Sequence, residues 1–388
     1  MYPHQIERLT GVLLRGGLSA LVATAPENVL YLTGFSPHDD DVGDAQTLAV
    51  FTPNASALIV PARDVPAVVA EGIDVDHVVC HGDLAAAFPE RQSAEIRRIR
   101  EIVSAAASSS AEALVAALGL AGVRGESLGL DEGRLSPAAW QDLVGRLAGA
   151  VPAAGPLAEA RRVKSPYEIE CLDRALRLVE ESLDAVIQAL ERGMTERDAA
   201  MLHAGEVVKR GGSPLHGVVV MGDRTWIRSA SPTDRALRPG DLVRFDVAAR
   251  HRGYCASVAR TAVFEEAAPP AERAYLALQT ALEAASDAAR PAVTAGHIVE
   301  TAALVAQAEG FSAGTCRLSG HGIGLAPRER PEIAGAGVAI VEVGEVLCLE
   351  ATHWDLGSMG LVIRDTLLMT TAGARVMNRS RHDLVVLD

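Results

Sequence analysis

The feature that most constrains the fold of this chain is an internal repeat in its second half, at an offset of about 100 residues. The segment Gly240-Asp-Leu-Val-Arg-Phe-Asp246 recurs as Gly344-Glu-Val-Leu-Cys-Leu-Glu350, and a helical segment at 195–211 recurs at 294–310. In both copies a glycine turn enters an apolar strand that ends in a carboxylate. A period this long is too large for a solenoid and indicates duplication within one domain.

Asp246 and Glu350 end the two repeated strands. Because pseudo-twofold repeats bring equivalent strand ends together, we expect these carboxylates to face one another across a shared cleft. Two carboxylates in one pocket suit either a metal site or an acid–base site. The repeat alone leaves both possibilities open.

The first part of the chain has a different pattern, in which amphipathic and strand-like segments alternate. Apolar strands are expected at 18–23, 48–51 and 57–60. The stretch 151–156 concentrates Pro, Gly and Ala, as domain boundaries do. Since 388 residues suffice for two or three domains, we predict an α/β (α+β) protein with domains at 1–155 and 156–388.

The clearest single helix is expected at about 166–192. Ser165 and Glu168 have the spacing of a capping box, and Pro166 stands at the first helical position. Apolar residues then recur at helical spacing up to a stop at Gly193.

Charge and cysteine content exclude several classes of protein. The chain has 36 basic and 50 acidic residues, and its net charge of −14 repels phosphate backbones and anionic lipid surfaces. We therefore expect neither nucleic acid nor a membrane as a partner. Five widely spaced cysteines without a CxxC pair indicate buried thiols. The chain start has no signal-peptide pattern, so we expect a cytoplasmic protein.

Four motifs follow one another along the chain: Ala25-Pro-Glu-Asn-Val-Leu-Tyr-Leu-Thr-Gly34, Arg162-Val-Lys-Ser-Pro-Tyr-Glu168, Pro239-Gly-Asp-Leu-Val243 and His321-Gly-Ile-Gly-Leu325. Together they resemble the signatures of the creatinase and Xaa-Pro peptidase superfamily, which includes prolidase and aminopeptidase P. The resemblance spans nearly the whole chain. It implies an N-terminal creatinase-like domain, a C-terminal pita-bread catalytic domain with pseudo-twofold symmetry, and a homodimer.

The resemblance also implies a set of metal ligands, and this chain departs from that set. In the peptidase members two aspartates, a histidine and two glutamates hold two divalent metals. Three of these positions fall on Asp246, His321 and Glu350. The second aspartate falls on Ser257 and the last glutamate on Arg364, so both bridging positions are lost.

The charges indicate what this departure means. Four family carboxylates balance two divalent ions, whereas here Asp246, Glu350 and Arg364 sum to −2 + 1 = −1. A guanidinium cannot lose its proton, so it would repel a metal ion and satisfy the two remaining carboxylates itself. We therefore predict a site without metal and a protein without a cofactor.

Two further positions depart from the family. The histidine that contacts substrate falls on Ser229, and the histidine of the HExP motif falls on Arg328. Creatinase is itself a metal-free member, but its catalytic histidine matches Ser229. The resemblance therefore does not transfer the creatinase mechanism.

We predict a metal-independent, creatinase-like hydrolase that cleaves a C–N bond in a small carboxylate-bearing substrate. In this prediction His321 acts as general acid and base, while Glu350 and Asp246 position water or a cationic substrate group. An elimination or ring-forming step would use the same groups.

The predicted substrate-binding residues are Arg328, Arg364, Ser229 and Ser257. The two arginines either pair with nearby carboxylates or form a cationic pocket that binds a substrate carboxylate or stabilises an oxyanion. The acidic segment 38–44 lacks the pattern of a calcium loop. It is expected to be solvated or to lie over the cleft of a partner subunit.

Two alternatives stay open. A surviving Xaa-Pro dipeptidase would keep a single metal on Asp246, His321 and Glu350. A catalytically silent pita-bread protein would keep the fold as a binding module.

Overall fold

The computed structural model describes residues 2–37, 47–124, 127–147, 149–312 and 314–387. The acidic segment 38–44, predicted to be solvated or to lie over a partner's cleft, lies outside the described residues. The chain forms two compact units, residues 1–161 and 162–388. The division falls later than the predicted boundary at 155, because Pro156 lies in the first turn of helix α7 (Ala154–Arg162), where proline is tolerated.

The N-terminal unit is a mixed sheet with helices, as the alternating pattern predicts. Among the described residues its strands lie in the order β4-β3-β2-β1-β5-β6. The strands are β1 (Ala20–Ala23), β2 (Leu48–Phe51), β3 (Ser56–Pro61), β4 (His77–His81), β5 (Leu128–Leu130) and β6 (Ala150–Pro152). The helices are α1 (Pro3–Gly16), α2 (Pro26–Thr33), η2 (Ala62–Asp64), α3 (Val65–Ala70), α4 (Ala94–Ser104), α5 (Ser110–Leu120) and α6 (Pro137–Arg146).

A buried carboxylate anchors the start of α2 in this unit. Asp131, which follows β5, has no exposed surface. Its Oδ2 accepts hydrogen bonds from the backbone N–H of Thr24 (3.2 Å) and Ala25 (2.9 Å) and from Asn28 Nδ2 (2.7 Å). Because a buried carboxylate must have its acceptors satisfied, these donors fix the entry into the 25–34 motif.

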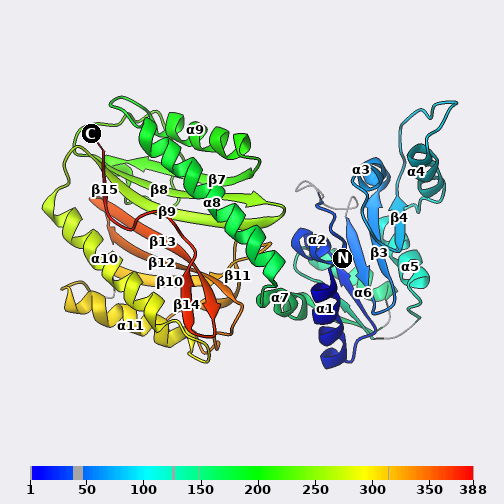
Figure 1. The fold of residues 1–388 in the computed structure, drawn as a ribbon. Helices are drawn as coiled ribbons and strands as arrows, with labels where there is room; N and C mark the ends of the chain where they lie inside the picture. Colours follow the sequence, from blue (N-terminus) through cyan, green and yellow to red (C-terminus); the bar gives the residue numbers. More distant parts are fainter. Residues whose placement is uncertain (1, 38–46, 125–126, 148, 313, 388) are drawn as a thin grey trace. The chain divides into compact units, whose positions relative to one another are not determined.

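The C-terminal unit is built on a second sheet (Figure 1). Its described strands lie in the order β11-β10-β12-β13-β9-β8-β7, with β14 on β13 and β15 on β9. The strands are β7 (Ser213–Met221), β8 (Leu242–His251), β9 (Tyr254–Phe264), β10 (Cys316–Gly322), β11 (Glu329–Ile333), β12 (Val346–Asp355), β13 (Met359–Thr370), β14 (Gly373–Val376) and β15 (Val385–Leu387). The helices are α8 (Pro166–Ala189), α9 (Glu196–Lys209), η3 (Gly222–Arg224), α10 (Pro269–Ala288) and α11 (Ala295–Ala308).

Helix α8 confirms the predicted capping box. The Ser165 hydroxyl accepts from the Glu168 N–H, and the Glu168 side chain accepts from the Ser165 N–H. The helix ends at Ala189, earlier than predicted, because Leu190 adopts an extended conformation.

The structure confirms the internal repeat. Thr195 and Thr294 are the N-caps of α9 and α11, and each hydroxyl accepts from a backbone N–H three residues on. Gly240 (φ 80°) and Gly344 (φ 86°) both adopt left-handed turns before β8 and β12. This conformation favours glycine, which explains why both copies keep it.

The alternation of side chains along the strands separates two faces of this sheet. On β12, Leu347, Leu349 and Ala351 belong to the core formed with α10 and α11, as does Ile363 on β13. Because neighbouring side chains on a strand point to opposite faces, Glu350 and Arg364 belong to the face away from that core. We call the two faces the helix face and the cavity face.

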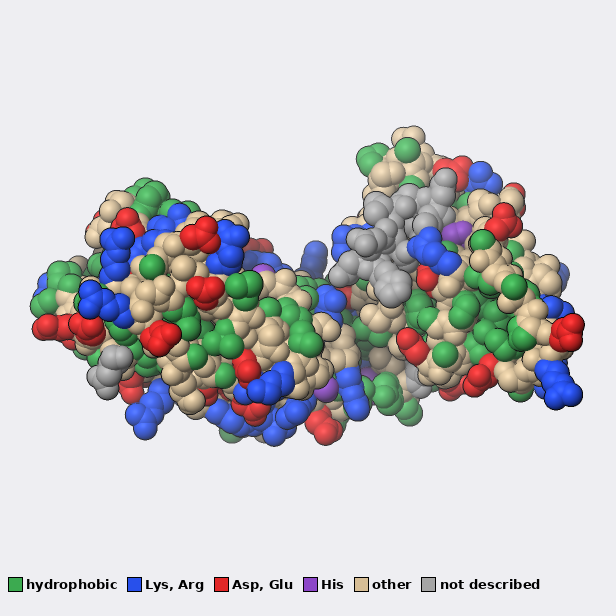
Figure 2. Space-filling view, turned by 90° about the horizontal axis from the view of Figure 1, so that it is seen from above, with side chains coloured by type: hydrophobic (Ala, Val, Ile, Leu, Met, Phe, Trp, Pro, Cys, Tyr) green, Lys and Arg blue, Asp and Glu red, His purple; other side chains and the backbone are tan. Residues whose placement is uncertain are grey.

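All five cysteines are buried free thiols, as predicted. No helix in the described ranges combines the length and apolar character needed to cross a bilayer. On the surface that Figure 2 shows, basic and acidic side chains are interspersed.

Candidate active site

A cavity of about 240 Å³ opens on the cavity face of the C-terminal unit. Five of the predicted site residues line it: Asp246, Ser257, His321, Arg328 and Arg364. The remaining lining residues are Leu215, His216, Ala248, Cys255, Ala256, Ile323 and Pro327. The repeat and the motifs therefore converge on one small pocket with apolar walls and a charged floor.

Arg364 binds both of the repeated carboxylates. Its Nη1 donates to Asp246 Oδ1 at 2.6 Å and its Nη2 to Asp246 Oδ2 at 3.2 Å. The same Nη2 also donates to Glu350 Oε2. The expected convergence of Asp246 and Glu350 is thus present, and the guanidinium lies between them. Glu350 contributes to the site through this ion pair and does not itself line the cavity.

These contacts keep Asp246 and Arg364 charged. Burial alone would raise the pKa of Asp246, but the hydrogen bond from His216 and the charge of Arg364 hold it well below its usual range. Burial would lower the pKa of Arg364, but Glu350 and Asp246 raise it above its ordinary value. Since an ion pair this buried is stable only when its charges are compensated, the three side chains form one unit.

His321 lies on β10 where the pairing with β11 is irregular. Its Nδ1 is 2.8 Å from the carbonyl oxygen of Gly322. Because a carbonyl only accepts, Nδ1–H is the donor and Nε2 is left as an acceptor in the neutral ring. Burial lowers the pKa of His321, and the charges of Arg328 and Arg364 lower it further. The ring is therefore held neutral.

Arg328 is the exposed cation of the site. Within the described part of the chain it makes no ion pair or hydrogen bond, although it lines the cavity. The neighbouring Glu329 is held by a buried ion pair to Lys164 Nζ (2.9 Å) and accepts from the Ala326 N–H (3.1 Å). This fixes the loop that carries Arg328, while the guanidinium stays available to a ligand.

Ser257 lies on β9, where the family places its second aspartate. Its hydroxyl is 3.7 Å from Cys348 Sγ, and the side chain is buried. Burial raises the pKa of the Cys348 thiol to about 11. A small neutral side chain and a protonated thiol therefore occupy this part of the site.

Ser229 is exposed and does not line the cavity described above. Its loop is held by Arg244, which is almost completely buried and donates to the carbonyl oxygens of Thr225 (3.0 Å) and Ile227 (2.6 Å). The guanidinium carbon of Arg244 also lies 5.0 Å from the centre of the Trp354 ring. The structure thus does not bring Ser229 to the wall of this cavity.

His216 is the main cavity residue that the sequence patterns do not predict. It lies on β7, and its Nε2 is 3.3 Å from Asp246 Oδ1. A single histidine in a strand that carries no motif does not by itself predict a functional site. The signal that could have found it is alternation: β7 pairs with β8 so that Val218 is opposite Asp246, and His216 has the same strand parity.

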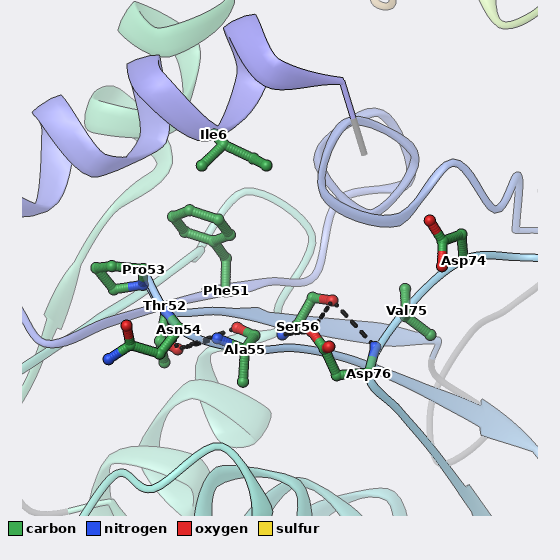
Figure 3. Close-up of a pocket in the computed structure, with 10 residues that line it drawn as sticks. All are labelled: Ile6, Phe51, Thr52, Pro53, Asn54, Ala55, Ser56, Asp74, Val75 and Asp76. Carbon is green, nitrogen blue, oxygen red and sulfur yellow. Dashed lines mark hydrogen bonds between the residues drawn. The ribbon is translucent and has the colours of Figure 1, made fainter.

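A second cavity, of about 280 Å³, lies in the N-terminal unit at the β2–β3 turn (Figure 3). Its polar groups are used in local structure: Asp76 Oδ2 accepts from the N–H (2.8 Å) and the hydroxyl (2.9 Å) of Ser56. The Ala55 N–H donates to the Thr52 hydroxyl (2.9 Å). These bonds stabilise the β2–β3 turn and tie the start of β3 to the segment before β4, so the polar groups of this hollow have a structural role.

Both units of the chain match families of known proteins. The profile of metallopeptidase family M24 matches residues 170–371, and that of the creatinase/prolidase N-terminal domain matches residues 5–163. A Mycobacterium tuberculosis protein named "Probable dipeptidase PepE" is 28% identical, covering 100% of this chain and 97% of that protein. The structure of an Xaa-Pro dipeptidase from Bacillus anthracis superposes with a TM-score of 0.82 at 19% identity, covering 99% of each chain. A dipeptidase PepE structure from Mycobacterium ulcerans gives 0.77 at 24% identity, over 99% and 97% of the chains.

The chain therefore belongs to metallopeptidase family M24, with a creatinase-like N-terminal domain and a C-terminal pita-bread domain. This confirms the resemblance and the fold class that its motifs predict.

The family name implies a metal centre, and the residues present do not fit one. In the described ranges no group of three or more His, Cys, Asp or Glu side chains is arranged to hold a metal ion. A guanidinium lies on the two carboxylates that the repeat supplies, and Ser257 offers one neutral oxygen. A permanent cation at this position repels a second one.

Proposed function

We propose that this chain is a hydrolase that cleaves a C–N bond in a small, carboxylate-bearing compound of dipeptide size without a metal ion. Family membership and the dipeptidase names of its relatives support hydrolysis of a C–N bond. The observation that carries the metal-free part of the proposal is the guanidinium of Arg364 between Asp246 and Glu350.

The charges of the cavity suit an anionic substrate. Arg328 is exposed at the cavity without an ion-pair partner among the described residues, so it can bind a carboxylate. Arg364 uses three of its five N–H groups on Asp246 and Glu350. The remaining two are available to stabilise negative charge on a substrate oxygen.

The volume and lining of the cavity limit the substrate. About 240 Å³ with apolar walls accommodates a compound with a few side-chain carbons and not a folded partner. Nε2 of His321 supplies a hydrogen-bond acceptor for water or for a substrate N–H group. A free carboxylate at one end and a C–N bond near the histidine describe a dipeptide or a similarly small amide.

The test is hydrolysis of Ala-Pro, Gly-Pro and Ala-Ala by protein purified without chelators, assayed before and after prolonged treatment with EDTA. We expect release of free amino acids at the same rate in both samples. Elemental analysis of the same preparation is expected to find far less than one equivalent of Mn, Zn, Co or Fe.

A second candidate function is favoured by the names of the relatives. An Xaa-Pro dipeptidase with one metal on Asp246, His321 and Glu350 would lose its activity in EDTA and regain it with Mn²⁺. That result would contradict the metal-free proposal while leaving hydrolysis of a C–N bond intact. If none of the three dipeptides were hydrolysed under any condition, a silent binding protein would replace both enzyme proposals.

Family resemblance also suggests a homodimer, and we retain this assembly and the cytoplasmic location as predictions. Light scattering is expected to give roughly twice the chain mass of 40.6 kDa. A monomer at micromolar concentration would contradict the dimer.

A further inference from the structure

His216 stands out in the cavity because a carboxylate fixes one of its nitrogens. Its Nε2 is 3.3 Å from Asp246 Oδ1, and 47% of its side chain is exposed. Both oxygens of Asp246 accept hydrogen bonds from the guanidinium of Arg364, as expected for a carboxylate in an ion pair, and such oxygens only accept. Nε2–H must therefore be the donor, and in the neutral ring Nδ1 remains a free acceptor.

We propose that His216 is the general base of this site: its Nδ1 takes a proton from the water that attacks the C–N substrate. This inference rests on the proposed function and assigns the acid–base step within it. Asp246 orients the ring and stabilises the imidazolium that forms, as a carboxylate behind a catalytic histidine does.

The step balances without any further reactant. One O–H bond of water breaks as its proton moves to Nδ1, and the water oxygen forms a bond to the carbonyl carbon. The C–N bond then breaks, and the departing nitrogen takes the proton from Nδ1. The products are a carboxylic acid and an amine, and the ring of His216 returns to its neutral form.

The surroundings of the two cavity histidines separate their roles. His216 has its Nε2 bound to an anion, Asp246, so the ring is oriented and its Nδ1 is left as an acceptor. His321 has a neutral carbonyl behind its ring, and its nearest charges include Arg328 and Arg364, which disfavour protonation. We therefore assign the proton transfer to His216 and leave His321 to orient water or substrate through Nε2.

A second histidine close to His216, His203, does not compete for the proton. His203, on α9, is buried, and its pKa is lowered to about 4, first by burial and then by the charge of His216. It stays neutral at the pH at which the enzyme would work. Among the described residues, the ionisable groups around His216 thus include the anion Asp246, the cation Arg364 bound to it, and the neutral His203, while His321 and Arg328 line the same cavity.

The decisive variant is His216→Gln. A glutamine amide can still donate to Asp246, but it has no basic nitrogen. For whichever of Ala-Pro, Gly-Pro and Ala-Ala the wild type hydrolyses fastest, we expect kcat to fall about 100-fold or more, with KM changed less than about threefold. Imidazole added to His216→Gly is expected to restore part of the rate.

The matched control is His251→Gln. His251 lies on β8, is partly exposed, and does not line the cavity. We expect it to keep the wild-type kcat. If His216→Gln keeps kcat within about threefold of wild type, the histidine is only a hydrogen-bond partner of Asp246, and the proposal is overturned while the proposed function stands.

A spectroscopic measurement tests the geometry separately from activity. In protein with ¹⁵N-labelled histidine, the signals lost in His216→Gln identify its ring nitrogens, and we expect the Nε2–H tautomer at neutral pH. An Nδ1–H tautomer overturns the proposal whether or not hydrolysis is found. Absence of hydrolysis by the wild type on all three dipeptides overturns the proposed function and this inference together.

Discussion

The two faces of the nine-stranded C-terminal sheet, as far as the chain is described, each carry an arginine bound to carboxylates, and the two networks differ in what surrounds them. On the cavity face, Arg364 binds Asp246 and Glu350. On the helix face, Arg260 donates to Asp365 Oδ1 at 2.8 Å. Arg364 and Asp365 are neighbours in sequence, so strand alternation alone sends them to opposite faces.

The helix-face network is closed within the protein. Arg260 is 2% exposed, and besides Asp365 it donates to the carbonyl oxygens of Ala259, Arg364 and Arg381 and to the Ser380 hydroxyl. The cavity-face network has fewer internal partners and borders a hollow with an exposed histidine and an exposed arginine. The comparison indicates that a charge network has a structural role when its donors are used internally and can serve function when some remain free.

The largest effect on stability is expected when the closed network is broken. Arg260→Met leaves Asp365 without its guanidinium and three carbonyl groups without their donor, and should lower the free energy of unfolding by about 4 kcal/mol. Urea unfolding monitored by circular dichroism measures this. The matched control is Arg375→Met at an exposed position on β14, which should change stability by less than about 0.5 kcal/mol. Equal effects of the two variants would contradict the structural role of Arg260.

Breaking the cavity-face network should cost somewhat less. Arg364→Met leaves Asp246 and Glu350 close together without a counter-charge. It should lower the free energy of unfolding by about 3 kcal/mol near pH 7. The pKa of Asp246 is lowered in the wild type, so the stability it contributes is present above its unfolded pKa and is lost as pH falls through the folded value. The difference between wild type and Arg364→Met should therefore shrink towards acid pH. A difference that grows on acidification would show that the carboxylates are not what Arg364 stabilises.

A smaller loss of stability, with the opposite pH dependence, is expected when His382 on the helix face is replaced. The hydrogen bond and charge of Asp365, 2.7 Å away, raise the pKa of His382. A raised pKa contributes stability that is complete below the unfolded pKa and is lost as pH rises through the folded value. His382→Gln should thus cost about 1 kcal/mol near pH 5 and nothing measurable near pH 9. Thermal unfolding at the two pH values checks this, and a pH-independent cost would contradict the ion pair.

The smallest change in stability is expected for Arg328→Met, below about 0.5 kcal/mol, because Arg328 is exposed and has no partner among the described residues. Its effect should instead fall on the substrate. Loss of a charge-assisted contact with the carboxylate should raise KM about 10- to 100-fold, with little change in kcat. Steady-state assays on the dipeptide hydrolysed fastest measure both constants. An unchanged KM would remove Arg328 from substrate binding.

Much of the fold and part of the site could be predicted from the sequence. The repeated glycine turns at Gly240 and Gly344 predicted that Asp246 and Glu350 converge, and the motif positions brought Arg364 to the same place. These inferences succeed because a turn followed by a strand fixes position along the chain and parity across the sheet.

The rest of the site depends on pairing between strands, which the sequence alone does not specify. His216 reaches Asp246 through the register of β7 on β8, where a shift by one residue would turn it to the opposite face. Motif spacing predicts Ser229 as a site residue, but its loop is held by Arg244, and no local sequence pattern predicts that Arg244 is buried.

The central claim is that the guanidinium of Arg364 takes the place of metal charge at this site. Titration calorimetry with Mn²⁺ on wild type, Ser257→Asp, Arg364→Glu and the double variant tests it most directly. The double variant restores both family carboxylates and should gain measurable Mn²⁺ affinity that the wild type and both single variants lack, because the two bridging ligands act on the same ions. Tight Mn²⁺ binding by the wild type, or no gain in a folded double variant, would contradict the account.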